Sequence, residues 1–291
     1  MAISYQLIKS VTARLYDESL RRIPTDTTAA LGRAIARERS PSALATLKVM
    51  VESAGAAQEN RSFVCSDAGV PVYVVKVGTR VRFDGDVRRA ITDGWHELVA
   101  GIQPPLLQHV THPLTLERGY FGKDMPLLSF DLVDGADYLD ITCSPKALGS
   151  GRWAALEIFS FPSVETIENY VLDVVRKAGS QPCPPVVVGV GIGGTFDHAA
   201  RIAKEAMLRP LGSSHEEPMV AAMERRLAAA INSSGYGPMG TGGDSTAYAV
   251  HVNYSSGHGF TPVAVCFNCW INRRTTARIF DSGEVRYGDG L

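Results

Sequence analysis

The sequence lacks an excess of charge of either sign and has no long apolar run. Its 291 residues include 29 Lys and Arg against 30 Asp and Glu, a formal net charge of -1, so no basic field attracts nucleic acid or anionic lipid. The apolar stretches at 185–192 and 262–267 are far shorter than the about 20 residues needed to cross a bilayer. We therefore expect a cytoplasmic protein that binds a small molecule, with neither nucleic acid nor membrane as a partner.

Cysteine is also scarce, because the chain has only five. An odd number in a chain of this size argues against a disulfide framework and for reduced thiols that are buried, ligating or reactive. Cys143 and Cys266 have apolar neighbours and are predicted to be buried as small hydrophobic side chains. Cys65, Cys183 and Cys269 lie at the edges of predicted elements, where a thiolate could face a pocket.

Cys266 and Cys269 form a C-x-x-C pair. No second pair and no paired histidines complete a zinc site, and no redox helix follows. If 262–267 is a strand, the two thiols point to opposite faces unless the chain bends after Phe267. The pair is therefore predicted to consist of two unlike cysteines.

Apolar spacing predicts helices over 3–21, 26–38 and 42–57, and from about residue 61 strands and helices follow in mixed order. The predicted strands are 70–77, 127–133, 138–143, 184–194, 246–254, 262–267 and 276–280; the predicted helices are 86–100, 164–177, 196–208 and 217–231. Asp134-Gly135 is a turn signal between two strands. We predict one α+β domain over 1–291, with a helical part over about 1–60 and a mixed α/β part with glycine-rich loops over about 61–291.

Two glycine-rich segments are candidate ligand-binding loops. GVGIGG at 189–194 follows a strand and precedes a helix, where backbone N–H groups can receive an anion. Its spacing fits neither G-x-G-x-x-G nor a phosphate loop. Tight packing of strand against helix and contact with a bound carboxylate both remain open, and GPMGTGG at 237–243 leaves the same alternatives.

The chain carries four motifs in order: VCSDAG at 64–69, CPPVVVGVGIGGTFDHAARIAKEA at 183–206, YGPMGTGGDSTAYAVHV at 236–252 and PVAVCFNCWINRR at 262–274. Together they resemble the α-type catalytic domain of the iron-sulfur hydro-lyases, the class I fumarases and the α subunit of L-tartrate dehydratase. The resemblance implies that Cys65, Cys183 and Cys269 hold a [4Fe-4S] cluster, with the glycine-rich loops around it. It gives Cys143 and Cys266 no part in the cluster.

The resemblance further implies reversible dehydration of a small hydroxy-carboxylate. Three thiolates leave one iron without a protein ligand, available as a Lewis acid for the substrate hydroxyl and carboxylate, while a base removes a proton. By resemblance, Asp67 and His258 are catalytic, although a solvated loop histidine is the alternative for His258. The implied substrate contacts are Ser66, Gly193, Gly194, Thr195, Lys146 and Arg152.

Several positions depart from the fumarase pattern. Ser66 and Ala68 replace a glutamine and a threonine around Asp67, the stretch around Gln103 lacks the family arginine, and Gly151-Arg152 replaces an acid-amide pair. These changes spare the cysteines, which favours a substrate other than fumarate.

The resemblance also implies a β-type subunit and an α2β2 heterotetramer. Two other interpretations stay open: a non-catalytic scaffold or cluster-binding subunit derived from this family, and a zinc or thiol-redox protein that uses Cys266 and Cys269.

Overall fold

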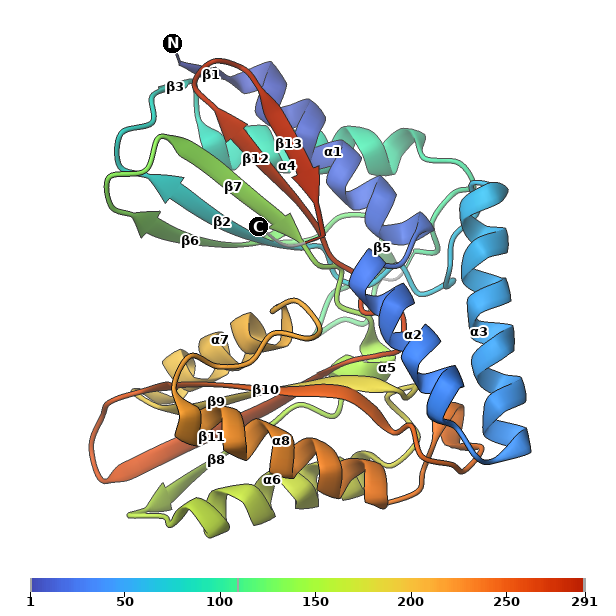
Figure 1. Ribbon diagram of the computed structural model, residues 1–291. Coiled ribbons are helices and arrows are strands. Elements are labelled where there is room, and N and C mark those ends of the chain that lie inside the picture. The colour runs from blue at the N-terminus through green and yellow to red at the C-terminus, as the bar shows by residue number, and fades with distance from the viewer. Residues whose placement is uncertain (1, 109, 290–291) are drawn as a thin grey trace. The chain divides into compact units, whose positions relative to one another are not determined.

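The computed structural model describes residues 2–108 and 110–289, and the chain forms two compact units (Figure 1). Unit 1 consists of Met1–Pro24, Ala54–Leu148 and Arg273–Leu291, and unit 2 consists of Thr25–Ser53 and Gly149–Asn272. Both contain helices and strands in mixed order, so the predicted α+β class is confirmed. Each unit is assembled from separate chain segments, and residues 1–60 are divided between the two units.

Unit 1 contains a five-stranded sheet with the strand order β13-β12-β7-β2-β6. Its strands are β2 (Val72–Gly78), β6 (Leu127–Val133), β7 (Tyr138–Cys143), β12 (Thr275–Phe280) and β13 (Val285–Gly288). The helices α1 (Tyr5–Arg21) and α4 (Val87–Gly101) pack on this sheet and on each other. Two short pairs complete the unit: β1 (Ile3–Ser4) with β3 (Phe83–Asp84), and β4 (Val110–Thr111) with β5 (Arg118–Gly119).

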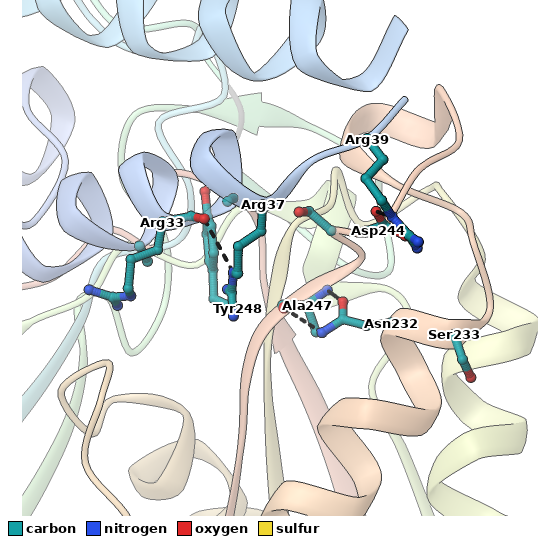
Figure 2. A pocket seen from close by; sticks show the side chains of 11 residues that line it. Arg33, Arg37, Arg39, Asn232, Ser233, Asp244, Ala247 and Tyr248 are labelled. Carbon is teal, nitrogen blue, oxygen red and sulfur yellow. Dashed lines mark hydrogen bonds and ion pairs between the residues drawn. The ribbon is translucent and has the colours of Figure 1, made fainter. Parts of the chain in front are cut away.

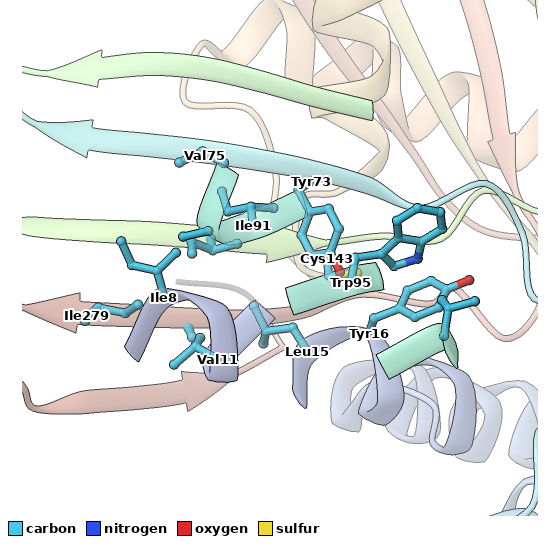
Figure 3. Close-up of a cluster of buried hydrophobic side chains, with 14 of the residues drawn as sticks. Ile8, Val11, Leu15, Tyr16, Tyr73, Val75, Ile91, Trp95, Cys143 and Ile279 are labelled. Atoms are coloured by element: carbon cyan, nitrogen blue, oxygen red, sulfur yellow. The ribbon is translucent and has the colours of Figure 1, made fainter. Parts of the chain in front are cut away.

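The unit 1 core follows from the helical spacing of α1 and α4. The Ser4 hydroxyl caps α1 by accepting from Leu7 N–H, and the Asp86 carboxylate caps α4 by accepting from Arg89 N–H. Each helix presents one apolar stripe to the sheet. Figure 3 shows these buried side chains meeting those of the strands, among them Ile8, Val11, Leu15, Ile91, Trp95, Tyr73, Val75 and Cys143.

The strands that flank Asp134-Gly135 do not form a hairpin. β2 lies between them and pairs parallel with β6 and antiparallel with β7. The connection runs across the end of β2, where a Cβ on Gly78 would collide with the Ala136 carbonyl. The turn signal was therefore correct, while the pairing was decided by the more buried β2.

Unit 2 contains a four-stranded sheet with the order β10-β9-β11-β8. Its strands are β8 (Ala155–Ser160), β9 (Val186–Gly193), β10 (Ala247–Ser255) and β11 (Phe260–Asn268). The helices α6 (Val164–Ala178) and α8 (Pro218–Ser233) pack on one face of the sheet, and α7 (Phe196–Met207) packs on the other. Unit 2 also holds α2 (Thr25–Arg37) and the 3-10 turn η1 (Pro238–Gly240), while α3 (Pro41–Glu59) and α5 (Leu148–Gly151) contribute residues to both units.

Strand direction gives the unit 2 sheet two distinct edges. β9 runs parallel to β10, and β11 runs antiparallel to both β9 and β8. We call the edge where β8, β9 and β10 begin and β11 ends the cysteine edge, because Cys183 precedes β9 and Cys269 follows β11. We call the opposite edge, which holds Gly193 and the loop after β10, the glycine edge. Within the described residues, no helix has both the length and the apolarity that crossing a membrane requires.

Candidate functional site

The cysteine edge brings together two cysteines that are far apart in sequence. The Trp270 N–H donates to the Cys183 carbonyl at 3.0 Å, so the residue after Cys269 is bonded directly to Cys183. Cys269 itself lies in a tight turn, closed by Asn272 N–H donating to its carbonyl at 2.9 Å. The buried Asn272 amide donates to the Thr27 hydroxyl, which fixes the turn within unit 2.

The glycine-rich loop at 236–244 holds Cys183 from a second side. Met239 N–H donates to the Pro184 carbonyl at 2.8 Å, one residue after Cys183. Cys183 has a left-handed backbone with a φ of 57°, a conformation that is uncommon for residues with a Cβ. Such strain persists only where the surroundings impose it, and it concentrates at functional sites.

The five cysteines fall into two groups by exposure. Cys143 is fully buried, and burial raises the pKa of its thiol to about 12. Cys266 is also buried, with its Sγ 3.7 Å from Met207 Sδ. Cys65, Cys183 and Cys269 are partly exposed, and none of the five is joined in a disulfide. The predictions that Cys143 and Cys266 are buried and that the C-x-x-C pair consists of unlike residues are confirmed.

Cys65 belongs to unit 1, in a loop that a buried arginine anchors. Arg273, only 3% exposed, donates from Nη2 to the Asp67 carbonyl at 2.7 Å and from Nη1 to the Ala68 carbonyl at 3.4 Å. The Asp67 carboxylate accepts from the backbone N–H groups of Gly69 and Leu148. Both Asp67 oxygens therefore hold the loop in place.

Unit 1 places Lys146 beside the same loop. Its backbone pairs with that of Val70 through two hydrogen bonds of 2.8 and 2.9 Å. Ser66 is exposed on the loop, whereas Ala68 is buried, and a threonine would be larger there. Unit 1 thus gathers three of the predicted polar site residues, which are Ser66, Asp67 and Lys146.

Arg152 belongs to unit 2 and lies at the cysteine edge. It is exposed just before β8, and its guanidinium lies 5.0 Å from the centre of the Trp153 ring. The sheet topology therefore places a cation at the same edge as Cys183 and Cys269.

The other predicted residues of unit 2 lie at the glycine edge. Gly193 ends β9, and Gly194 and Thr195 lead into α7. The exposed His258 stacks on the Phe260 ring in the loop after β10. An eight-residue strand is roughly 23 Å long. Unit 2 therefore does not bring Gly193, Gly194, Thr195 and His258 together with Cys183 and Cys269.

Two glycines of the GVGIGG segment serve strand-to-helix packing. A Cβ on Gly189 or Gly191 would collide with the carbonyl of Ala203 or Ala199 on α7. At the turn, Gly193 and Gly194 have φ values of 84° and 67°, which favour glycine. The first part of the segment is thus explained by packing alone, without a ligand.

The start of α7 carries a carboxylate rather than an open anion site. A hydrogen bond from Thr195 and the backbone N–H groups at the helix start hold the pKa of Asp197 below its ordinary value. The Asp197 carboxylate, in the first turn of α7, therefore already interacts with the free N–H groups at the start of this helix.

Residues 9–278 match the family model described as fumarate hydratase (Fumerase). The chain belongs to this family. It is 36% identical over 283 residues to the putative L(+)-tartrate dehydratase subunit alpha of Methanocaldococcus jannaschii, covering 94% of this chain and 97% of that protein. It is 32% identical over 223 residues to the L(+)-tartrate dehydratase subunit alpha of Escherichia coli strain UTI89, covering 74% and 72% of the two chains. The resemblance found in the sequence is thereby confirmed.

Sequence reasoning missed two residues of this fumarate hydratase family member. Arg273 anchors the Asp67 loop, and the only signal was the arginine pair that ends the CWINRR motif. The partly buried Tyr248 donates from its hydroxyl to the Trp270 carbonyl at 3.3 Å, directly after Cys269. Among the described residues, no group of three or more His, Cys, Asp or Glu is arranged to hold a metal ion.

Proposed function

We propose that this chain is the α subunit of a [4Fe-4S]-dependent hydro-lyase that reversibly dehydrates a small hydroxy-carboxylate other than fumarate. Cys65, Cys183 and Cys269 hold the cluster. The observation that carries the proposal is the hydrogen bond from Trp270 N–H to the Cys183 carbonyl, which joins two of the three ligand segments. The fumarate hydratase family match and the names of the relatives support the reaction class.

The donor set suits the proposed cofactor. Thiolates are the usual protein ligands of iron-sulfur clusters. The three proposed ligands are the three cysteines whose side chains reach solvent. Arg273 binds the loop that carries Cys65, and it lies only four residues after Cys269 in the chain.

When held by Cys65, Cys183 and Cys269, the cluster would supply a Lewis acid for the substrate hydroxyl. Arg152 contributes a positive charge for a substrate carboxylate at the cysteine edge. Asp67 is the proposed catalytic carboxylate, with Ser66 and Lys146 as further contacts. We assign no contact with the proposed cluster to Gly193, Gly194, Thr195 and His258, because roughly 23 Å of strand separates the glycine edge from Cys183.

The proposed partner is a β-type subunit in an α2β2 assembly. Both relatives above are named as a subunit alpha. The stretch around Gln103 lacks the family arginine, which leaves this chain short of substrate-binding cations. The β-type subunit would supply them.

The deciding experiment measures iron and acid-labile sulfide in anaerobically purified protein. We expect about four irons per chain in the native protein, as a [4Fe-4S] cluster requires, and loss in each of Cys65→Ala, Cys183→Ala and Cys269→Ala. Cys266→Ala is the matched control, because it removes a nearby buried thiol and should keep the iron. Retention of iron in any of the three ligand variants would refute the assignment.

A non-catalytic subunit is the second candidate function. It is favoured by Asp67, whose two oxygens both accept from backbone amides and so serve the loop. The cluster-loaded chain, with its β-type subunit, should be assayed for dehydration of L-tartrate and other hydroxy-dicarboxylates. Turnover supports the enzyme, whereas a full iron complement without turnover of any substrate supports the scaffold.

A further inference from the structure

Unit 2 contains a pocket of about 430 Å³ that none of the predicted site residues lines. Figure 2 shows its walls, which come from α2, the end of α8 and the start of β10. The lining side chains that matter here are those of Arg33, Arg37, Arg39, Asp244 and Tyr248. The volume is in the range of small-molecule sites.

The pocket carries more positive charge than its own acid offsets. Arg39 is engaged by the Asp244 carboxylate through two hydrogen bonds of 2.8 Å. Arg33 and Arg37, which are both exposed, have no ion-pair partner within the described part of the chain. Arg37 Nε donates to the Arg33 carbonyl at 3.2 Å, but neither guanidinium group has a counter-charge among the described residues.

Arg33 and Arg37 stand one turn apart on α2. Figure 2 shows both side chains extending from the same side of the helix. Like charges at this spacing destabilise a helix by a few tenths of a kcal/mol. An anion that bridges the two guanidinium groups would reverse that repulsion, and guanidinium binds carboxylate through paired hydrogen bonds.

The floor of the pocket is held rigidly. The Asn232 amide accepts from Thr246 N–H and Ala247 N–H at 2.8 Å and donates to the Ala247 carbonyl at 3.2 Å. These bonds tie the end of α8 to the start of β10 and occupy the Asn232 amide oxygen and one of its two N–H donors. The arginines are therefore the groups available to select the ligand.

We propose that this pocket binds a small dicarboxylate, with one carboxylate on Arg33 and the other on Arg37. This binding site does not require a cluster, because Arg33 and Arg37 both lie on α2. Tyr248 connects the pocket to the cysteine edge, because it lines the pocket and donates to the Trp270 carbonyl.

The test is isothermal titration of the purified chain with succinate, propionate and phosphate. We expect succinate to bind more tightly than propionate or phosphate, because only succinate places two carboxylates on two guanidinium groups. Arg33→Gln and Arg37→Gln should each weaken succinate binding about tenfold, or about 1.4 kcal/mol. Arg225→Gln is the matched control, since it removes an exposed arginine from α8 outside the pocket and should leave binding unchanged.

Several outcomes would overturn the proposal. No succinate binding at about 10 mM, tighter binding of phosphate, or equal binding by wild type and both variants would each do so. A further outcome is that no small anion binds and that less β-type subunit co-purifies with the two variants than with wild type. In that case Arg33 and Arg37 form a protein interface instead. Iron content, measured on the same samples, distinguishes the cluster proposal from the dicarboxylate proposal. Anaerobically purified protein that contains no iron but binds succinate would refute the cluster and leave the dicarboxylate site standing.

Discussion

At the residue scale, Cys183 adopts a left-handed backbone although it carries a Cβ. The cost of such a conformation is about 1–2 kcal/mol for an L-residue other than glycine. Three hydrogen bonds around it, from Trp270 N–H, from Met239 N–H to the next carbonyl, and from its own N–H to the Ser180 carbonyl, hold the conformation in place. A proposed ligand at this position explains why a cysteine stands where glycine would fit better.

Replacing Cys183 therefore separates stability from cluster binding. Cys183→Gly should raise the free energy of unfolding by about 1 kcal/mol relative to Cys183→Ala, because glycine removes the Cβ strain. Both variants should contain no iron. Urea denaturation of the two iron-free proteins measures the difference, and a glycine variant that is less stable than the alanine variant would contradict the strain argument.

Cys143 predicts a pH dependence of stability. Burial raises the pKa of its thiol from 9.0 to about 12, so the folded chain keeps a proton that the unfolded chain releases above about pH 9. The stabilisation that the protonated Cys143 thiol gives the folded chain is fully present below pH 9. Above pH 9 the free energy of unfolding falls by about 1.4 kcal/mol per pH unit, up to about pH 12. Urea denaturation at pH 8, 9 and 10 should show a shallower alkaline decline in Cys143→Ala than in wild type, and equal slopes would contradict the assignment.

At the scale of elements, β9 and α7 pack backbone against backbone. A Cβ on Gly191 would collide with the Ala199 carbonyl, an atom that cannot rotate away. We expect Gly191→Ala to lower the free energy of unfolding by about 3 kcal/mol, the upper end of overpacking costs. The control is Gly55→Ala on α3, where a Cβ meets nothing within 4 Å and helix propensity favours alanine by about 1 kcal/mol. Urea denaturation measures both, and a tolerated Gly191→Ala would show that α7 can shift.

Strong periodicity made most elements predictable. The spans of β6 and β7 were predicted from alternation at 127–133 and 138–143, and the structure has the same bounds. β8 was missed because its side chains are mostly exposed at the edge of the sheet and its pattern carries little apolar contrast. Strand pairing was not readable either, since the insertion of β2 between β6 and β7 depends on contacts across the whole unit.

At the scale of the whole molecule, successive chain segments belong alternately to the two units. No shift in amino-acid composition marks the positions where the chain passes from one unit to the other. α1 belongs to unit 1 and α2 to unit 2, although only three residues separate them. The proposed cluster cysteines could be chosen from motifs because each lies beside an unusual local sequence, such as Cys183 before two prolines. The pocket at Arg33 and Arg37 could not, because two exposed arginines on a helix look like any solvated surface until β10 and α8 are placed beside them.

The interleaving gives the proposed cluster a consequence for stability. Cys65 belongs to unit 1, whereas Cys183 and Cys269 belong to unit 2, so a cluster bound by all three stabilises both folded units by mass action. Anaerobic reconstitution should slow amide hydrogen exchange in β7 of unit 1 and in β9 of unit 2 together. Cys266→Ala should show the same double protection, and Cys65→Ala should show none in either strand. Protection confined to β9 in wild type would mean that a cluster forms without Cys65, and the ligand set would then have to be sought within unit 2 and the β-type subunit.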